Sequence, residues 1–451
     1  MARTLGFLHV RTNLSQAANL DSARPDLAVS PDGNWVAVVW TEEYSPGVGD
    51  HKGDVYLRAA SEDEGGWRDK VLVFDGSEIE SAYDAAMAIS NTTVHVAYVV
   101  VDDTPGYEKM QVRYRDCSLS SGECNPEQQA VSVPSWYKIT WVDIAVGENG
   151  LPHVVWSQTD QYGDDGVIRY TNLLYDDEKQ LWQWSPAERV SLEYDCYRPA
   201  VAYANGYAHV VWEKEQDEPK QYYIGYGRRD ESGWETTKLS ADQTTLPPGN
   251  PDVAAWGNRV FVTWDWCSDM DPNPPCNLFK VVYRRSDDGG STWGVDTSKT
   301  REVGTGQLYY GPQELAEYHS SDDEGVAPGD QRDESLLGLQ PSITLNRDGW
   351  PAVAWHADRS EGDGTDYVIY YTYALTDGQD HVNWITPTLL GWGGALRGSA
   401  NFGVAQPGPG EQHVHLVYMQ KSGTGAWEVF YDSNEGDQYE HIFLPMVMRG
   451  G

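Results

Sequence analysis

A segment of about sixty residues recurs seven times along the chain, which restricts the fold to a repeat architecture. Each copy begins with a short apolar strand and a turn, and its second strand ends in an aromatic residue. These second-strand ends are Trp40, Tyr98, Trp156, Trp212, Trp264, Trp355 and Tyr418. The third strand ends in tyrosine in every copy but the first, which has Ala59. Aromatic and β-branched runs between Gly, Asp and Asn turns, without helical periodicity, predict an all-β fold.

The repeat predicts a seven-bladed β-propeller with four-stranded antiparallel blades, because radial repetition protects the edges of the sheets. We expect one domain over residues 1–451, with an insertion at about 304–335 between blades 5 and 6 and a tail at about 440–451. The segment FLHVRTNLS (7–15) resembles the outer strands of other copies. The N-terminal strand is therefore expected to join the last blade and close the ring.

Composition excludes some partners and suggests a compartment. The 69 Asp and Glu against 32 Lys and Arg give a net charge of −37, which repels nucleic acid. No apolar run is long enough for a membrane span. The pairs Cys117/Cys124 and Cys267/Cys276 are spaced to close local disulfides and leave Cys196 free, with metal binding by the pairs as the alternative. Disulfides indicate a secreted or cell-surface protein of bacterial type.

One turn carries a family motif. SDDGGSTW, from Ser286 to Trp293, matches the Asp-box of sialidases and related BNR-repeat proteins, and ASEDEGGW (60–67) resembles it in the first copy. The resemblance implies a sialidase-like β-propeller in which the Asp-box is structural. The motif residues are Ser286, Asp288, Gly290, Thr292 and Trp293. Sialidases carry Arg-x-Pro before the first inner strand, whereas this chain has Arg24-Pro25, and the remaining sialidase machinery has no residue-by-residue match here.

Recurring residues are expected to serve the blade, and residues that break the repeat are candidates for function. His95, His153, His209 and His415 recur at one second-strand position, so we interpret them as structural. The position three residues before Leu27 and its equivalents differs from copy to copy and should form a ring at the mouth of the propeller. Its candidate binding residues are Arg24, Asp84, Trp141, Arg198, Asn250 and Gln340. Arg24 and Arg198 are expected to face each other across the ring, with pairing to loop carboxylates as the alternative.

The loops between second and third strands should reach the same face. They contribute Tyr44, Asp160, Tyr162, Trp266, His356 and Asp358 as further binding candidates. The insertion adds Tyr309 and Tyr310, with Glu314, Glu317, Tyr318 and His319 in the same segment. Long loops at such a position often form binding walls.

The candidate residues favour recognition or processing of an extracellular glycan. Arg24 and Arg198 would hold an acidic sugar and Trp141 would stack on it. The alternatives are a structural or filament-forming surface protein that self-associates through its C-terminal tail, and a sialidase-like glycoside hydrolase. No cofactor is expected except a calcium ion, for which Asp269, Asp271 and Asn273 supply oxygen ligands at alternate positions.

Overall fold

The structure is a computed structural model, and the ranges below refer to the parts of the chain that it describes. These are residues 12–16, 20–43, 53–61, 66–77, 80–104, 109–134, 136–177, 179–217, 220–240, 248–267, 278–293, 313–319, 341–346, 349–358, 367–376, 382–384, 388–391, 401–408, 411–421 and 427–433. None of these ranges contains a helix long and apolar enough to cross a membrane.

The described residues form an all-β structure of antiparallel sheets, as the sequence predicted. The first sheet contains β2 (Ser22–Val29), β3 (Trp35–Glu43), β4 (Gly53–Ser61), β5 (Gly66–Trp67), β6 (Val71–Phe74), β7 (Glu80–Ser90), β8 (Thr93–Asp102), β9 (Lys109–Ser118) and β10 (Gln128–Pro134). Its two halves join only where Gly53 of β4 pairs with Ala82 of β7. We therefore describe β2–β6 as sheet 1 and β7–β10 as sheet 2.

Three sheets follow along the chain. Sheet 3 contains β11 (Tyr137–Val146), β12 (Pro152–Asp160), β13 (Val167–Asp176), β14 (Leu181–Trp184) and β15 (Glu188–Arg189). Sheet 4 contains β16 (Cys196–Ala204), β17 (Tyr207–Asp217), β18 (Lys220–Asp230) and β19 (Gly233–Lys238). Sheet 5 contains β20 (Gly249–Trp256), β21 (Arg259–Cys267), β22 (Leu278–Ser286) and β23 (Gln313–His319).

The last two sheets include the first strand of the chain. Sheet 6 contains β24 (Ser342–Leu345), β25 (Pro351–Asp358), β26 (Tyr367–Thr376), β27 (Val382–Trp384) and β28 (Thr388–Gly391). Sheet 7 contains β29 (Asn401–Gly408), β30 (Glu411–Lys421), β31 (Trp427–Ser433) and β1 (Thr12–Asn13). β1 pairs with β31, with Thr12 opposite Tyr431.

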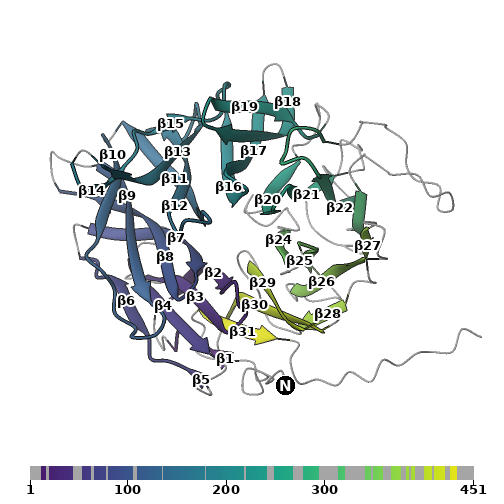
Figure 1. The fold of residues 1–451 in the computed structure, drawn as a ribbon, viewed down its shortest axis with the longest axis horizontal. Coiled ribbons are helices and arrows are strands. Elements are labelled where there is room, and N and C mark those ends of the chain that lie inside the picture. Colours follow the sequence, from purple (N-terminus) through teal and green to yellow (C-terminus); the bar gives the residue numbers. More distant parts are fainter. Residues whose placement is uncertain are drawn as a thin grey trace, which may run out of the picture.

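The sheets follow one another around a ring, with their first strands toward its centre (Figure 1). Each first strand lies beside the next, in the order β2, β7, β11, β16, β20, β24 and β29, and β29 lies beside β2. The strands predicted around Leu27 and its equivalents are these inner strands. This arrangement places the same position of every repeat at the same level of the ring.

A repeated aromatic contact joins neighbouring sheets. His209 Nδ1 shares a 2.7 Å hydrogen bond with the Tyr226 hydroxyl, and Trp293 of the next sheet meets the Tyr226 ring edge-on at 4.7 Å. The same arrangement involves His95, Tyr114 and Trp184, then His153, Tyr170 and Trp234, and finally His415, Tyr431 and Trp67. These contacts confirm that the recurring histidines serve packing between sheets.

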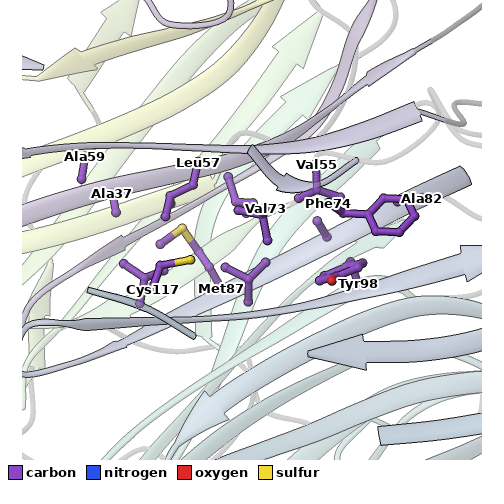
Figure 2. Packing of buried hydrophobic residues seen from close by; sticks show 14 of the residues in the cluster. Ala37, Val55, Leu57, Ala59, Val73, Phe74, Ala82, Met87, Tyr98 and Cys117 are labelled. Carbon is purple, nitrogen blue, oxygen red and sulfur yellow. The ribbon is translucent and has the colours of Figure 1, made fainter. Parts of the chain in front are cut away.

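Sheets 1 and 2 meet in a different way. Sheet 1 has Ala37 at the histidine position and Leu57 at the tyrosine position, so the sequence alignment that placed Ala59 there was wrong by two residues. Cys117 of sheet 2 belongs to the apolar cluster that contains Ala37 and Leu57 (Figure 2). Cys117 forms a disulfide with Cys124, as predicted. Smaller side chains on one sheet are thus matched by a disulfide-closed loop on the other. Cys196 is free, as predicted, and it is buried. The Cys267–Cys276 disulfide stays a prediction, because Cys276 lies outside the described residues.

Carboxylates join the inner strands in pairs. Asp26 Oδ2 accepts a hydrogen bond from the Met87 amide in the next sheet at 2.7 Å. Asp143 does the same for Val201, and Asp252 for Ile343. We call these three interactions the carboxylate clips. Each uses its other oxygen to accept the amide of the following residue, so both oxygens are satisfied.

Candidate functional site

A β-bulge interrupts the inner strand of each of sheets 1 to 5 at the same level of the ring. The pairing between first and second strand shifts there in all five sheets. The bulge residues have left-handed backbone angles, with φ of 49° at Arg24, 65° at Asp84, 49° at Trp141, 49° at Arg198 and 49° at Asn250. We call these five residues the bulge ring. They are the predicted mouth residues, except Gln340, which lies outside the described residues.

The left-handed backbone is an unusual state for these side chains. It costs about 1–2 kcal/mol per residue for anything but glycine, and asparagine and aspartate tolerate it best. Arginine and tryptophan have no such local compensation. Bulges re-aim side chains and occur next to binding sites, and strained backbone gathers where function requires a fixed side-chain direction. Five such residues at one level therefore indicate a site.

A polar network begins at Arg24 and runs along the bulge ring. Arg24 Nη1 lies 2.9 Å from Asp84 Oδ1 in the neighbouring sheet. Asp84 Oδ2 accepts the amide of Val142, the residue after Trp141, at 2.9 Å. The Asp84 carboxylate raises the pKa of Arg24 above its ordinary value even though burial lowers it, and the charge of Arg198 lowers it slightly.

The network continues through Arg198. Its guanidinium carbon lies 5.3 Å from the centroid of the Trp141 ring, and its Nη1 lies 3.0 Å from Glu213 Oε2. Glu213 Oε1 accepts the amide of Asn250, whose Nδ2 donates to Asp265 Oδ2 at 2.9 Å. The chain of contacts thus links the bulge residues of five successive sheets.

Two buried carboxylates support the second half of this network. Glu213 and Asp265 are 0% and 4% exposed. Burial raises the pKa of Glu213, and the adjacent Arg198 guanidinium opposes that rise. Because both carboxylates hold bulge-ring residues, we assign them a positioning role.

Pairing changes the electrostatics expected of the arginines. Arg24 and Arg198 each meet a carboxylate, so neither contributes an uncompensated positive charge to the bulge ring. Each uses only Nη1 for these contacts with described residues, and their side chains are 36% and 33% exposed. The guanidinium groups can still donate hydrogen bonds, but the electrostatic basis for selecting a sugar carboxylate is lost. The structure favours the alternative in which the arginines pair with carboxylates.

Several other predicted residues lie apart from this network or outside the described ranges. Asp160 accepts the Tyr162 and Asp164 amides at 2.8 and 2.9 Å, which fixes a turn that leaves Tyr162 77% exposed. Trp266 lies in β21, and His356 and Asp358 lie in β25, so these three belong to second strands and not to the loops in which they were predicted. The predictions for Tyr44, Tyr309, Tyr310, Asp269, Asp271, Asn273 and the tail concern residues outside the described ranges, so the calcium site stays a prediction.

Part of the insertion predicted at about 304–335 is a strand of sheet 5. Residues 313–319 form β23, which pairs with β22 and completes sheet 5. Glu314, Glu317, Tyr318 and His319 therefore belong to the outermost strand and not to a loop over the bulge ring. The sequence did not reveal this strand because it follows the Asp-box turn only after a long intervening segment.

The Asp-box residues make a closed turn after β22. Asp288 Oδ1 accepts the Ser286 hydroxyl at 2.8 Å and the Thr292 amide at 2.8 Å, and its Oδ2 accepts the Thr292 hydroxyl at 2.6 Å. Gly290 has φ of 81° and touches the Tyr226 hydroxyl so closely that a Cβ would overlap it. All carboxylate contacts of Asp288 thus serve the turn.

Sequence reasoning missed a second group of polar and aromatic residues on sheet 3. Arg169 of β13 and Arg189 of β15 are directly opposite, and Arg169 lies near Tyr137 and Tyr194. Nothing in the repeat distinguished Arg169, because Arg113 occupies the same position in the preceding copy. The surroundings of Arg169 and Arg189 depend on the register of β15, which has two residues.

The backbone strain of the bulge ring is testable at Trp141. Trp141→Gly is expected to be more stable than Trp141→Ala by about 1 kcal/mol, because both remove the indole but only alanine places a Cβ in the left-handed region. Thr140, one residue earlier, has no positive φ, so there the alanine variant should be the more stable of the pair. Urea denaturation of the four variants measures both differences. Equal stability of the two Trp141 variants would show that the bulge is unstrained.

Comparison with known proteins gives distant likenesses only. No family profile and no curated protein matches the sequence. The NanB sialidase of Streptococcus pneumoniae aligns with a TM-score of 0.45 and 9% identity over 95% of this chain and 70% of that one. The Trypanosoma rangeli sialidase gives a TM-score of 0.44 and 9% identity over 91% of this chain and 54% of that one. A likeness this distant assigns neither a family nor an activity.

Proposed function

We propose that the chain is a carbohydrate-recognition protein built on a closed seven-bladed β-propeller, with the bulge ring as its binding site. The cyclic order of the inner strands and the pairing of β1 with β31 support the closed ring. The disulfide between Cys117 and Cys124 supports an oxidising, extracellular setting. The observation that carries the functional part is the row of five left-handed bulge residues at one level.

The chemistry of the bulge ring suits a polyhydroxylated ligand. Sugar hydroxyls both donate and accept hydrogen bonds, and the ring presents guanidinium donors, a carboxylate acceptor and an amide that does both. Trp141 supplies an apolar face that can pack on the C–H face of a sugar. Because Arg24 and Arg198 are already paired with carboxylates, this site favours hydroxyl groups over a free anion.

Binding is better supported than catalysis. Glu213 and Asp265 are buried and hold Arg198 and Asn250, so they are not placed to exchange protons with a ligand. Most glycoside hydrolases use a pair of accessible carboxyl groups flanking the scissile bond, whereas sialidases use a tyrosine nucleophile. Incubation with each bound glycan, followed by analysis of reducing ends, tests the hydrolase alternative.

An array of neutral and acidic oligosaccharides, followed by calorimetry on the hits, tests the proposal. Arg24→Gln and Trp141→Ala are expected to weaken glycan binding, by roughly 10- to 150-fold for the arginine contact. Arg228→Gln is the matched control, because Arg228 is also paired with a carboxylate, Glu235, but lies beside the Asp-box turn. Absence of binding by the parent protein, or equal binding by all variants, would refute the proposal and favour a structural role.

A further inference from the structure

Sheet 3 places two positive charges directly against each other. Arg169 of β13 and Arg189 of β15 are Cα partners in the antiparallel pair. Like charges in this position destabilise a sheet. Burial lowers the pKa of Arg169, and the charge of Arg189 lowers it further. The arrangement is therefore unfavourable for the protein alone.

Neither arginine has a carboxylate partner within the described ranges. Arg189 donates to the carbonyls of Ser191 and Leu192 at 2.7 and 3.2 Å, and Arg169 Nε is buried without a hydrogen-bond partner there. Other arginines of the same chain do pair with carboxylates: Arg24, Arg113, Arg198, Arg228, Arg229 and Arg285. Within the described ranges, Arg169 and Arg189 differ from these six arginines in having no ion pair, and Arg58 and Arg115 also donate to backbone carbonyl groups.

Exposed aromatic side chains surround the two arginines. Tyr194 is 54% exposed and lies beneath Arg189, whose guanidinium carbon is 4.5 Å from the ring centroid. Tyr137 is 39% exposed. The phenol groups of Tyr137 and Tyr194 oppose the fall in the pKa of Arg169 that burial and Arg189 cause. Positive charge and flat apolar surface thus occur together, as binding of a charged sugar requires.

The segment that carries Tyr194 is held in place. The ammonium group of Lys214, which is 1% exposed, donates to the Tyr194 carbonyl at 2.6 Å and lies 3.2 Å from Asp195. The Cys196 amide donates to the Gly166 carbonyl at 2.9 Å, which joins this segment to the β12–β13 connection. A surface fixed in this way loses little conformational entropy when a ligand binds.

The cluster is continuous with the bulge ring. Tyr137 and Trp141 lie on the same strand, four residues apart, which corresponds to roughly 13 Å. Tyr194 likewise precedes Arg198 by four residues where the chain passes from sheet 3 to sheet 4. One ligand chain can therefore contact both places.

We propose that Arg169 and Arg189, with Tyr137 and Tyr194, form a subsite for an anionic group of the glycan that the bulge ring binds. This inference rests on the proposed function and names its substrate class, an acidic oligosaccharide of several residues. Guanidinium groups bind carboxylate and sulfate oxygens through paired, charge-assisted hydrogen bonds. The bulge ring, whose arginines are paired with carboxylates, would bind the hydroxyl groups of the glycan, and the sheet 3 subsite would bind its anionic group.

Calorimetry with three probes tests this assignment: hexagalacturonate, its carboxyl-reduced neutral counterpart and a sulfated galactan hexasaccharide. The parent protein should bind at least one charged probe more tightly than the neutral one. Arg169→Gln and Arg189→Gln should each weaken that charged probe by roughly 10- to 150-fold and leave the neutral probe unchanged. Arg24→Gln should weaken all probes, and Arg228→Gln none. The preferred charged probe distinguishes a carboxylate from a sulfate ligand.

Stability separates binding from a structural role. Arg169 and Arg189 repel each other across the strand pair, so the Arg169→Gln variant should melt at the same temperature as the parent or higher. Loss of a structural contact would instead lower the melting temperature. Equal affinity of the parent for charged and neutral probes would overturn the subsite and leave the bulge-ring function standing. Absence of binding to all three probes and to the oligosaccharide array would overturn both.

Discussion

Replacing His209 with phenylalanine is expected to lower, by about one, the number of protons that the protein takes up on unfolding between roughly pH 6 and pH 4. His209 is fully buried, and burial lowers its pKa from 6.5 to about 3. The unfolded histidine binds its proton first as the pH falls, so the free energy of unfolding decreases below about pH 6.5. At pH 4.5 the decrease from this side chain is about 3 kcal/mol.

Subtracting the free energy of unfolding of the parent from that of the variant at each pH isolates the contribution of His209. Burial raises the pKa of Asp252 to about 6, so that carboxyl group changes stability in the opposite direction over the same range. Phenylalanine fits the site, because Phe261 holds the equivalent position in sheet 5, opposite Ala254 as His209 is opposite Ala202.

Urea denaturation from pH 7 to pH 4 measures the effect. Tyr226→Phe is the control, because it removes the hydroxyl that bonds His209 but keeps the imidazole, so its pH dependence should match the parent. A His209→Phe variant with the same slope as the parent would mean that this histidine is not held neutral in the folded state.

Arg198→Ala is expected to destabilise the protein by about 3–5 kcal/mol, because it leaves the buried Glu213 carboxylate without its cation. Glu213 has side-chain exposure of 1%, whereas Arg198 is 33% exposed. The charge left behind is therefore worse solvated after removal of the arginine than after removal of the glutamate. Glu213→Gln, which can still accept the Asn250 amide, should destabilise much less.

A double-mutant cycle separates pairing from packing. Arg198→Ala/Glu213→Gln should recover most of the stability lost by Arg198→Ala alone, as measured by urea denaturation at pH 7. Additive losses would show that Arg198 stabilises the fold through its contact with Trp141 instead. Because Arg198→Ala is expected to destabilise the fold, Arg24→Gln is the better variant for measuring ligand binding.

The repeat located the first three strands of each sheet, but not their ends or their irregularities, and not β23. Trp156 and Tyr170 were predicted to end their strands, but they lie inside β12 and β13, which continue to Asp160 and Asp176, and they pack between sheets. The bulge ring was found because side chains vary at one repeat position. Its left-handed backbone was not predictable, since Arg24 and Trp141 have no preference for positive φ.

The sheet 3 subsite could not be predicted for a different reason. It depends on which residue of β15 lies opposite Arg169, and a strand of two residues carries no periodic signal. The exposure of Tyr194 depends on the buried anchor at Lys214, a lysine that composition alone would place at the surface. Such features follow from tertiary register and not from local pattern.

The carboxylate clips join the sheets in pairs, and they also show a repeat of two sheets. Asp26, Asp143 and Asp252 stand in sheets 1, 3 and 5, while Ala86 and Ala200 hold the same position in sheets 2 and 4. The element that repeats is thus a pair of unlike sheets, as expected if a two-sheet segment was duplicated. In sheet 7, which β1 completes, Asn401 holds this position. Inserting or deleting one sheet among sheets 1 to 6 would place like sheets side by side, whereas inserting or deleting a clipped pair would preserve the alternation.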